Sequence, residues 1–256
     1  SSTVFPLTER LAANFKEDGY TGNITVDSIG TGAGFERFCK AGEADIANAS
    51  RPIKAEETEN CSAIQREPLE FRVGTDALVV AVSAENDFVT DLTLEELAKV
   101  FSTAANWSDI RPEWPAKPIT RFSAGTDSGT FDFFVEAVFA QGVEGGPDNI
   151  GYFGYAYFKE NATKLRAVKI SGIAHTFKTA EDGSYPLSRP LFIYSTAALM
   201  KEKPQVAAFL NYYLSNVNDE IDEVGYFPAS QENLDAAKQA WLDATQIRLQ
   251  DLPAEI

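Results

Sequence analysis

The sequence has little of the chemistry on which metal and thiol sites depend. Its 256 residues include one histidine, His175, and two cysteines, Cys39 and Cys61. These cysteines form no CxxC pair and no Cys/His cluster, so no metal site is expected. No uninterrupted apolar run approaches the roughly 20 residues that a membrane-spanning helix needs. The first residues lack a basic start and an apolar stretch, so if the protein is exported, we expect its signal peptide to have been removed.

Positive charge is also scarce. There are 22 Lys and Arg against 38 Asp and Glu, which gives a formal net charge of -16. This balance argues against nucleic acid or an anionic membrane surface as a partner. Any small anion must be held by local dipoles and one or two placed cations. With 44% hydrophobic residues, the chain can bury a core as one large domain or two smaller ones.

The two cysteines lie 22 positions apart. One even pair fits a structural disulfide in an oxidising compartment, which favours export. Two buried free thiols are the alternative, and the sequence leaves both open.

Short β-branched or apolar segments alternate with amphipathic ones, which is typical of an α/β fold. The predicted strands are residues 23–30, 44–50, 76–83, 118–125 and 189–196. The predicted helices include 92–101, 203–216 and 230–249. Thr93 and Glu96 have the spacing of a capping box, and Ser230 is a candidate helix cap.

Three helix starts combine small or hydroxylated residues with an amphipathic face that follows at once. They lie at residues 3–15, 30–39 and 126–138. A helix start leaves backbone N–H groups without internal partners and carries partial positive charge, so each is a candidate anion cradle. Plain helix capping is the alternative at each one.

Ser50 and Arg51 follow a predicted strand directly. Ligands of open α/β sheets gather outside the carboxyl ends of strands. The five N–H donors of an arginine suit a tetrahedral oxyanion, although a surface salt bridge is the more common fate of this residue.

The sequence closely resembles a known family, the PstS phosphate-binding proteins of bacterial phosphate ABC importers. The stretches that carry the resemblance, in chain order between about residue 1 and about residue 228, are STVFP, SIGTGAGFERFCKAGEADIANASRPI, VFSTAANWSDIRPEWP, SAGTDSGTFDFF, NIGYFGYAY and YPLSRPLFIY. The resemblance implies a two-lobed type II periplasmic-binding-protein fold, in which helices flank a mixed sheet in each lobe. It places lobe I at residues 1–78 and 192–256 and lobe II at residues 79–191.

The resemblance also implies the ligand, the partners and the site. Inorganic phosphate is enclosed in the interlobe cleft by hinge closure and delivered to membrane permease subunits, by a monomer in the periplasm or exported to the cell surface. Matched motif by motif, the phosphate-binding residues are Thr3, Val4, Thr31, Gly32, Ser50, Ser128, Gly129 and Thr130. No cofactor is expected.

The charged residues depart from the best-known branch of the family. That branch has an aspartate after the serine of the first lobe and an arginine shortly before the SGT of the second. Here Arg51 takes the first position, Ala124 the second, and Asp127 precedes Ser128. We therefore expect Arg51 and Asp127 to contact the ligand, with Asp127 accepting a hydrogen bond from the proton that phosphate carries and sulfate lacks. The alternative is that Asp127 only caps the helix beginning at Phe131.

Other functions are less well supported by the residues. A receptor for arsenate or sulfate is the alternative, since these anions are also tetrahedral. Catalysis is not expected, because there is no GxSxG motif and His175 has no recognisable partner and is expected in a loop or on the surface.

Overall fold

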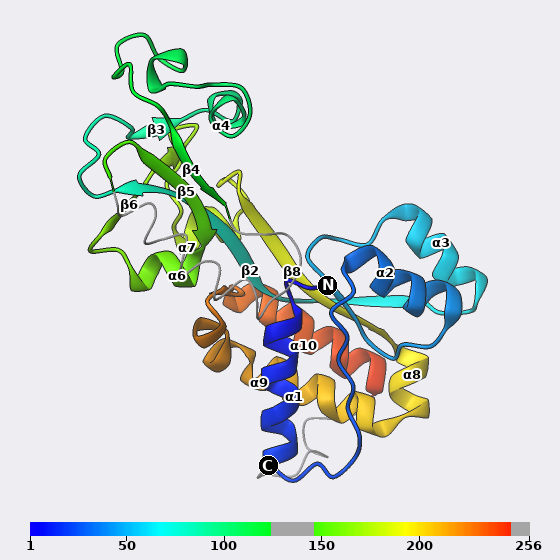
Figure 1. The fold of residues 1–256 in the computed structure, drawn as a ribbon. Coiled ribbons are helices and arrows are strands. Elements are labelled where there is room, and N and C mark those ends of the chain that lie inside the picture. The colour runs from blue at the N-terminus through cyan, green and yellow to red at the C-terminus, as the bar shows by residue number, and fades with distance from the viewer. Residues whose placement is uncertain (124–145, 247–256) are drawn as a thin grey trace. The chain divides into compact units, whose positions relative to one another are not determined.

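The chain folds into two compact units (Figure 1). In this computed structural model, the residues described are 1–123 and 146–246. The first unit comprises Ser1–Thr75, Pro190–Val224 and Pro228–Ile256, and the second comprises Asp76–Arg189 and Gly225–Phe227. Two strands belong to both, β2 (Pro68–Ser83) and β8 (Ser188–Thr196). The fold is thus the mixed α/β architecture that the sequence predicts.

In the first unit, long helices form one layer of the core. They are α1 (Phe5–Glu17), α9 (Pro204–Val224) and α10 (Gln231–Thr245), with the short α8 (Ala197–Glu202) beside them (Figure 1). Pro6 lies in the first turn of α1, where its missing N–H breaks no helical bond. Trp241 is buried and donates through Nε1 to the Ala207 carbonyl at 3.0 Å, which ties α10 to α9. The hydroxyls of Thr8 and Tyr213 join α1 to α9 at 3.1 Å.

The other layer of the first unit lies around a short strand, β1 (Ala47–Ala49), which pairs antiparallel with β8. Helix α2 (Thr31–Glu36) continues into a π-helical turn, η1 (Arg37–Ala41), and α3 (Ala55–Ala63) packs against that turn. Gly42 ends the turn at φ +69°, a left-handed conformation that suits glycine. The buried residues that fill this layer are Phe35, Phe38, Cys39, Ala47, Ala49, Cys61, Phe192, Tyr194 and Leu199.

The second unit is built on a sheet in which β5 (Asn149–Gly154) pairs antiparallel with β2 and parallel with β4 (Thr120–Ser123). Strand β6 (Leu165–Ala167) also pairs with β2. A separate parallel pair joins β3 (Asp91–Leu92) to β7 (Lys169–Ile170). Other elements in the described part of the chain are α4 (Leu94–Val100), η2 (Trp107–Asp109), α6 (Tyr155–Glu160), α7 (Phe177–Glu181) and β9 (Phe227–Pro228).

The aromatic core of the second unit centres on Trp107. Its ring meets those of Phe88 and Trp114 edge to face, with centroids 5.5 and 5.9 Å apart. This geometry is favourable for aromatic quadrupoles. The Trp107 indole N–H donates to the Asp148 carbonyl at 3.0 Å, so its polar atom is satisfied although the side chain is buried.

Several sequence predictions are confirmed by local geometry. The predicted strands at 44–50, 76–83, 118–125 and 189–196 contain or fall within β1, β2, β4 and β8. The Thr93 hydroxyl accepts from the Glu96 N–H at 3.1 Å, and the Glu96 carboxylate accepts from the Thr93 N–H at 2.8 Å, which completes the capping box of α4. The Ser230 hydroxyl likewise accepts from Asn233 at the start of α10.

The predicted strand at residues 23–30 is wrong. The segment joins no sheet in the part of the chain that the structure describes. Its β-branched residues favour an extended chain, but a strand also needs a ladder of hydrogen bonds to a neighbour. Instead the segment lines a cavity, which is described below.

Glu96 also accepts two hydrogen bonds from Arg111, at 2.8 and 2.9 Å. These bonds lower the pKa of Glu96 to about 2. Because the folded pKa lies below the unfolded one, the pair stabilises the fold above about pH 4.5 and the benefit is lost as the pH falls toward 2.

We expect Glu96→Gln to lower the free energy of unfolding at pH 7 by about 1–2 kcal/mol, a figure reduced for solvent screening. The deficit should shrink as the pH falls from 5 to 3 in urea titrations. Glu95→Gln is the matched control, since Glu95 is exposed and forms a surface ion pair with Lys99 four residues on. A deficit that does not change with pH would contradict this assignment.

Candidate functional site

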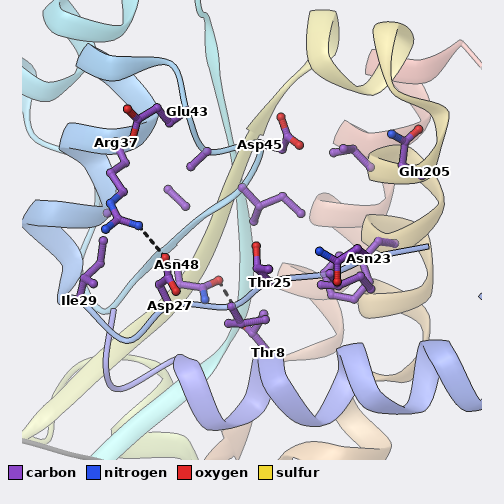
Figure 2. A pocket seen from close by; sticks show the side chains of 18 of the residues that line it. Thr8, Asn23, Thr25, Asp27, Ile29, Arg37, Glu43, Asp45, Asn48 and Gln205 are labelled. Atoms are coloured by element: carbon purple, nitrogen blue, oxygen red, sulfur yellow. Dashed lines mark hydrogen bonds and ion pairs between the residues drawn. The ribbon is translucent and has the colours of Figure 1, made fainter. Parts of the chain in front are cut away.

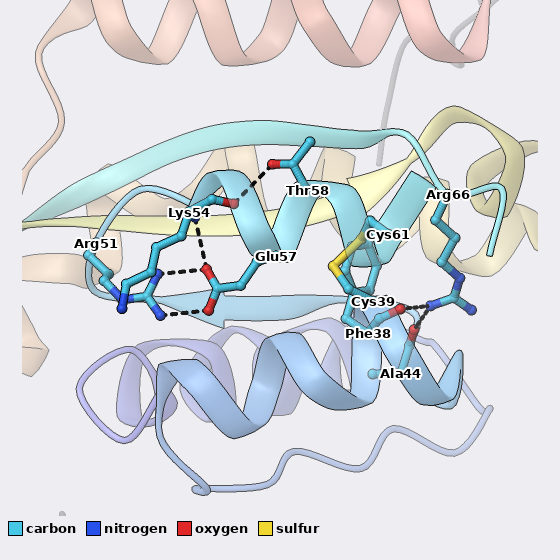
Figure 3. Close-up of a disulfide and its surroundings, with 9 residues drawn as sticks. All are labelled: Phe38, Cys39, Ala44, Arg51, Lys54, Glu57, Thr58, Cys61 and Arg66. Atoms are coloured by element: carbon cyan, nitrogen blue, oxygen red, sulfur yellow. Dashed lines mark hydrogen bonds and ion pairs between the residues drawn. A yellow bond between two sulfur atoms is a disulfide. The ribbon is translucent and has the colours of Figure 1, made fainter. Parts of the chain in front are cut away.

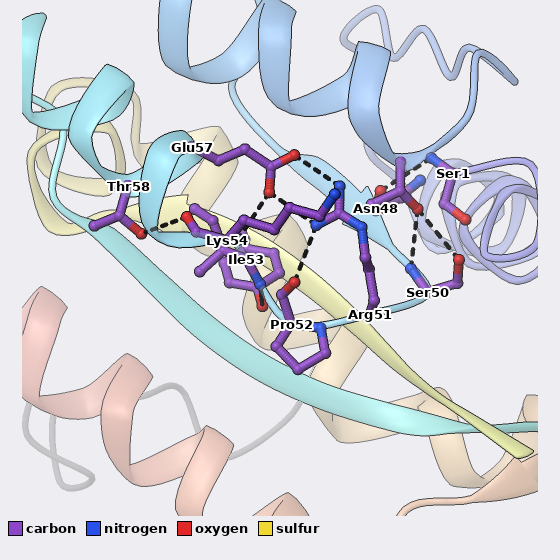
Figure 4. A network of polar contacts seen from close by, with 11 residues as sticks. Ser1, Asn48, Ser50, Arg51, Pro52, Ile53, Lys54, Glu57 and Thr58 are labelled. Carbon is purple, nitrogen blue, oxygen red and sulfur yellow. Dashed lines mark hydrogen bonds and ion pairs between the residues drawn. The ribbon is translucent and has the colours of Figure 1, made fainter. Parts of the chain in front are cut away.

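The end of β1 and the start of α2 meet through two hydroxyl groups. The Ser50 backbone N–H donates to Thr31 Oγ1 at 3.1 Å, and the two side-chain oxygens lie 3.2 Å apart (Figure 4). Thr31 and Ser50 are 19 positions apart in the sequence, and each is only partly buried. Two of the residues predicted to contact the ligand are therefore in direct contact, with oxygens that can both donate and accept.

Two glycines shape the start of α2. Gly30 has φ +83°, a conformation open to glycine and strained for most other residues. No side chain within the described ranges caps this helix. A Cβ atom added to Gly32 would have no described atom within 4 Å. The backbone at Gly32 is thus open to the approach of a small group.

The start of α1 lies in the same unit. The Ser1 nitrogen donates to the Asn48 carbonyl at 2.9 Å, one residue after Ala47 on β1. Val4 is fully buried at the start of α1, and Thr3 is partly buried. The segment that carries Thr3 and Val4 is therefore anchored to the strand that leads to Ser50.

Arg51 is held on two sides (Figure 4). Its Nη1 and Nη2 atoms donate to the two carboxylate oxygens of Glu57 at 2.8 and 2.7 Å, and Nη1 also donates to the Pro52 carbonyl at 3.1 Å. The guanidinium carbon lies 5.6 Å from the centre of the Phe35 ring, within cation–π range. Arg51 is thus engaged in an ion pair, the alternative that the sequence left open, and it stands one residue from Ser50.

Glu57 belongs to the first turn of α3. One of its oxygens also accepts from the Lys54 backbone N–H at 2.9 Å. Burial raises the pKa of Glu57, but the hydrogen bonds from Arg51 and Lys54 outweigh burial and hold the pKa below its usual value. Glu57 is therefore an anion that two donors fix in place.

The ring of Tyr194 completes this cluster from β8. It packs edge to face on Phe35 at 5.1 Å, and its hydroxyl accepts from the Ile53 N–H at 3.0 Å and donates to Glu70. Burial and the neighbouring Glu70 carboxylate raise the pKa of Tyr194, so the phenol stays protonated. The loop that carries Arg51 is thus fastened to the core at Ile53.

Cys39 and Cys61 form a disulfide between η1 and α3 (Figure 3), so the disulfide prediction is confirmed. Both residues are buried. Next to it, the Arg66 guanidinium donates to the carbonyls of Phe38 and Ala44 at 2.8 and 2.7 Å. The disulfide and Arg66 together brace the helices that carry Thr31 and Glu57.

Four of the predicted ligand residues, Asp127, Ser128, Gly129 and Thr130, lie outside the residues that the structure describes. Arg121 in the second unit donates to the carbonyls of Val100, Ala104 and Ile119, which occupies most of its N–H groups.

His175 lies in a loop, as expected, but it is partly buried rather than on the surface. Its ring packs against those of Phe158 and Tyr185, with centroids 5.1 and 6.3 Å away. This burial lowers its pKa. The histidine is therefore part of an aromatic cluster of the second unit.

A cavity of about 400 Å³ lies in the first unit between α1, the extended segment 23–29 and the start of α9 (Figure 2). The polar side chains that line it include those of Thr8, Thr25 and Asn48, which Figure 2 labels. The Thr8 hydroxyl donates to Asn48 Oδ1 at 3.2 Å. None of the predicted ligand residues within the described ranges lines it. A second cavity of about 380 Å³, between α2 and α3, is lined by both Gly32 and Arg51.

Sequence reasoning did not identify Glu57 or Phe35 as parts of this cluster. Phe35 could be recognised only as a core residue of a helix face, and Glu57 is one of 38 acidic residues. Among the residues described, no group of three His, Cys, Asp or Glu side chains is placed to hold a metal ion.

Several known proteins are similar to this chain over most of its length. A family model for a PBP superfamily domain matches residues 1–217. The phosphate-binding protein PstS of Staphylococcus haemolyticus is 36% identical over 91% of this chain and 80% of its own length. The protein SphX of Synechocystis is 36% identical over 93% of this chain and 79% of its own length.

Solved structures agree on the fold. One from Planctomyces limnophilus, described as a possible phosphate binding protein, superposes with a TM-score of 0.86 at 39% identity and covers 96% of both chains. An ABC-type phosphate transport receptor from Vibrio cholerae gives a TM-score of 0.71 at 21% identity over 89% of this chain and 97% of the receptor, and so supports the fold alone.

Proposed function

We propose, from the premise that this chain belongs to the PstS-like family of phosphate-binding proteins, that it binds inorganic phosphate and delivers it to an ABC importer. The observation that carries the proposal is the contact between Thr31 and Ser50 beside Arg51, at the end of a strand and the start of a helix. These are groups that bind an oxyanion without a metal. The role is binding and release, not turnover.

The site combines donors of three kinds. Thr31 and Ser50 supply hydroxyls, the open start of α2 at Gly32 supplies backbone N–H groups, and Arg51 supplies a cation. We assign Thr3, Val4, Ser128, Gly129 and Thr130 to the same ligand set by their match to the family motifs. In a chain of net charge -16, such local donors must outweigh the repulsion of the surface.

Calorimetric titration of phosphate-stripped protein tests the proposal. Saturable one-to-one binding of phosphate, with sulfate at least about 100-fold weaker, is the expected result, a difference of about 2.7 kcal/mol. Arsenate should compete with phosphate, since its shape and protonation are similar. Absence of phosphate binding, or a preference for sulfate, would overturn the proposed function.

Asp127→Asn examines the basis of selectivity. A carboxylate accepts a hydrogen bond from protonated phosphate, but it faces only acceptors on sulfate. We expect the variant to bind sulfate at least about tenfold more tightly than the parent protein does, a gain of about 1.4 kcal/mol. Sulfate exclusion as strong as in the parent would assign Asp127 to helix capping instead.

The partners and location follow from the same proposal. The protein acts as an exported monomer, with functional lobes at residues 1–78 and 192–256 and at residues 79–191, and it docks on the membrane permease subunits of the importer. None of the described helices is long and apolar enough to cross a membrane. Pull-down of the detergent-solubilised permease by the phosphate-loaded chain would test the docking.

A further inference from the structure

Three of the five N–H donors of the Arg51 guanidinium have acceptors among the described residues. Glu57 occupies the end-on edge, formed by Nη1 and Nη2, and the Pro52 carbonyl takes the remaining N–H of Nη1. Of the five N–H donors of an arginine, two are left over, on Nε and on Nη2. Within the described ranges they have no acceptor, and they lie side by side on the other edge.

The free edge matches an oxyanion. Two parallel N–H groups on one side of a guanidinium bind two oxygens of a phosphate or a carboxylate at once. Arg51 is the residue after Ser50, whose backbone N–H already points to Thr31 Oγ1. An anion held at Ser50 therefore lies next to the residue that carries this free edge.

The orientation of the guanidinium is fixed by Glu57, the Pro52 carbonyl and the Phe35 ring. Glu57 sets its direction through two hydrogen bonds, and the guanidinium carbon lies 5.6 Å from the centre of the Phe35 ring. Glu57 is in turn held by the Lys54 N–H. The Glu57 side chain is 16% exposed and that of Arg51 31%, so neither is a freely mobile surface group.

We propose that Glu57 is a positioning residue for anion binding, which occupies the end-on edge of Arg51 so that the Nε–Nη2 edge is presented to the ligand. The inference rests on the proposed function and deepens it. Glu57 does not touch the anion in this arrangement. Its contribution is the orientation of Arg51, whose rotamers would otherwise have to be ordered on binding.

Positioning by Glu57 and repulsion by its negative charge have opposite effects on phosphate affinity. Removal of a negative charge near an anion site lowers the Coulomb repulsion on the anion, which by itself favours anion binding. If Glu57 only contributed charge, its loss would tighten phosphate binding. A weakening therefore isolates the positioning contribution.

A double-mutant cycle with calorimetric phosphate titration tests this. We expect Glu57→Ala to weaken phosphate binding about tenfold in the parent protein, which is about 1.4 kcal/mol. In the Arg51→Ala background the same change should leave the affinity unchanged or raise it, because Glu57 then only repels the anion. Glu57→Gln retains one acceptor for Arg51 and should restore binding to within about threefold of the parent, or about 0.6 kcal/mol.

Glu56→Ala is the matched control. Glu56 is exposed in the same helical turn and carries the same charge, so its variant should bind phosphate within about twofold of the parent. Thermal unfolding of every variant separates a loss of fold from a loss of positioning.

The outcomes are distinct. Unchanged or tighter binding by Glu57→Ala in the parent, or an equal loss in both backgrounds, would overturn the positioning role. If the parent itself binds no phosphate, the proposed function fails first. A loss in Glu57→Ala that Arg51→Ala abolishes and Glu57→Gln largely reverses would establish it.

Discussion

Arg51→Ala is expected to weaken phosphate binding by about 100-fold or more. The variant loses two charge-assisted hydrogen bonds to the ligand, each worth about 1.5–3 kcal/mol. It also leaves the Glu57 carboxylate without its principal partner, since Arg51 supplies two of the three hydrogen bonds that Glu57 accepts. An unpaired carboxylate next to the site then repels the anion.

Calorimetric titration with phosphate measures this loss, and Arg37→Ala is the control. Arg37 lies in the same unit and also forms an ion pair, with Asp27 at 2.6 Å, but both side chains are about half exposed, at 48% and 59%. Its removal changes the net charge by the same amount, so phosphate affinity should stay within about threefold. Equal losses in the two variants would mean that overall charge, not a specific contact, governs binding.

The second large effect concerns the disulfide. Replacement of both Cys39 and Cys61 by alanine is expected to lower the free energy of unfolding by about 3 kcal/mol, because the crosslink no longer restricts a closed loop of about 23 residues in the unfolded chain. Both cysteines are buried against Phe35 and Phe38, so the lost sulfur atoms add a small packing cost.

Urea unfolding with and without a reducing agent measures the effect. Reduction should destabilise the parent protein by a similar amount and leave the double variant unchanged, which makes the variant its own control. A reductant effect in the double variant would show that another process is being measured. Because the disulfide joins η1 to α3, phosphate affinity should also fall if the bracing of Thr31 and Glu57 matters for the site.

The Arg51 and disulfide variants test related features, because the disulfide braces the elements that carry the residues of the site. The Thr31–Ser50 contact and the Arg51–Glu57 pair meet at the adjacent residues Ser50 and Arg51, and the disulfide joins η1, which continues the helix of Thr31, to α3, which carries Glu57. If this bracing loosens, the hydroxyls and the guanidinium are no longer fixed with respect to each other. The donors would remain, but their arrangement before binding would be lost.

Local features were predictable from the sequence because their partners are neighbours along the chain. The capping box of Thr93 and Glu96 closes over three residues, and Ser230 caps α10 in the same way. Hydroxyls at turns and periodic apolar faces also follow from short-range geometry. The motif at Thr31 and the Ser50–Arg51 pair were identified on the same basis.

From the sequence alone we could predict the mixed α/β class, the capped helices, the candidate anion-binding residues and the family resemblance. Three further features became apparent only in the folded protein: residues 23–30 join no sheet within the described ranges, Cys39 and Cys61 form a disulfide, and Glu57 is the carboxylate that holds Arg51. These outcomes depend on which distant segments the core brings together. Packing in space selects the partner of a strand, the partner of a thiol and one carboxylate among 38. Spacing along the chain does not specify these partners.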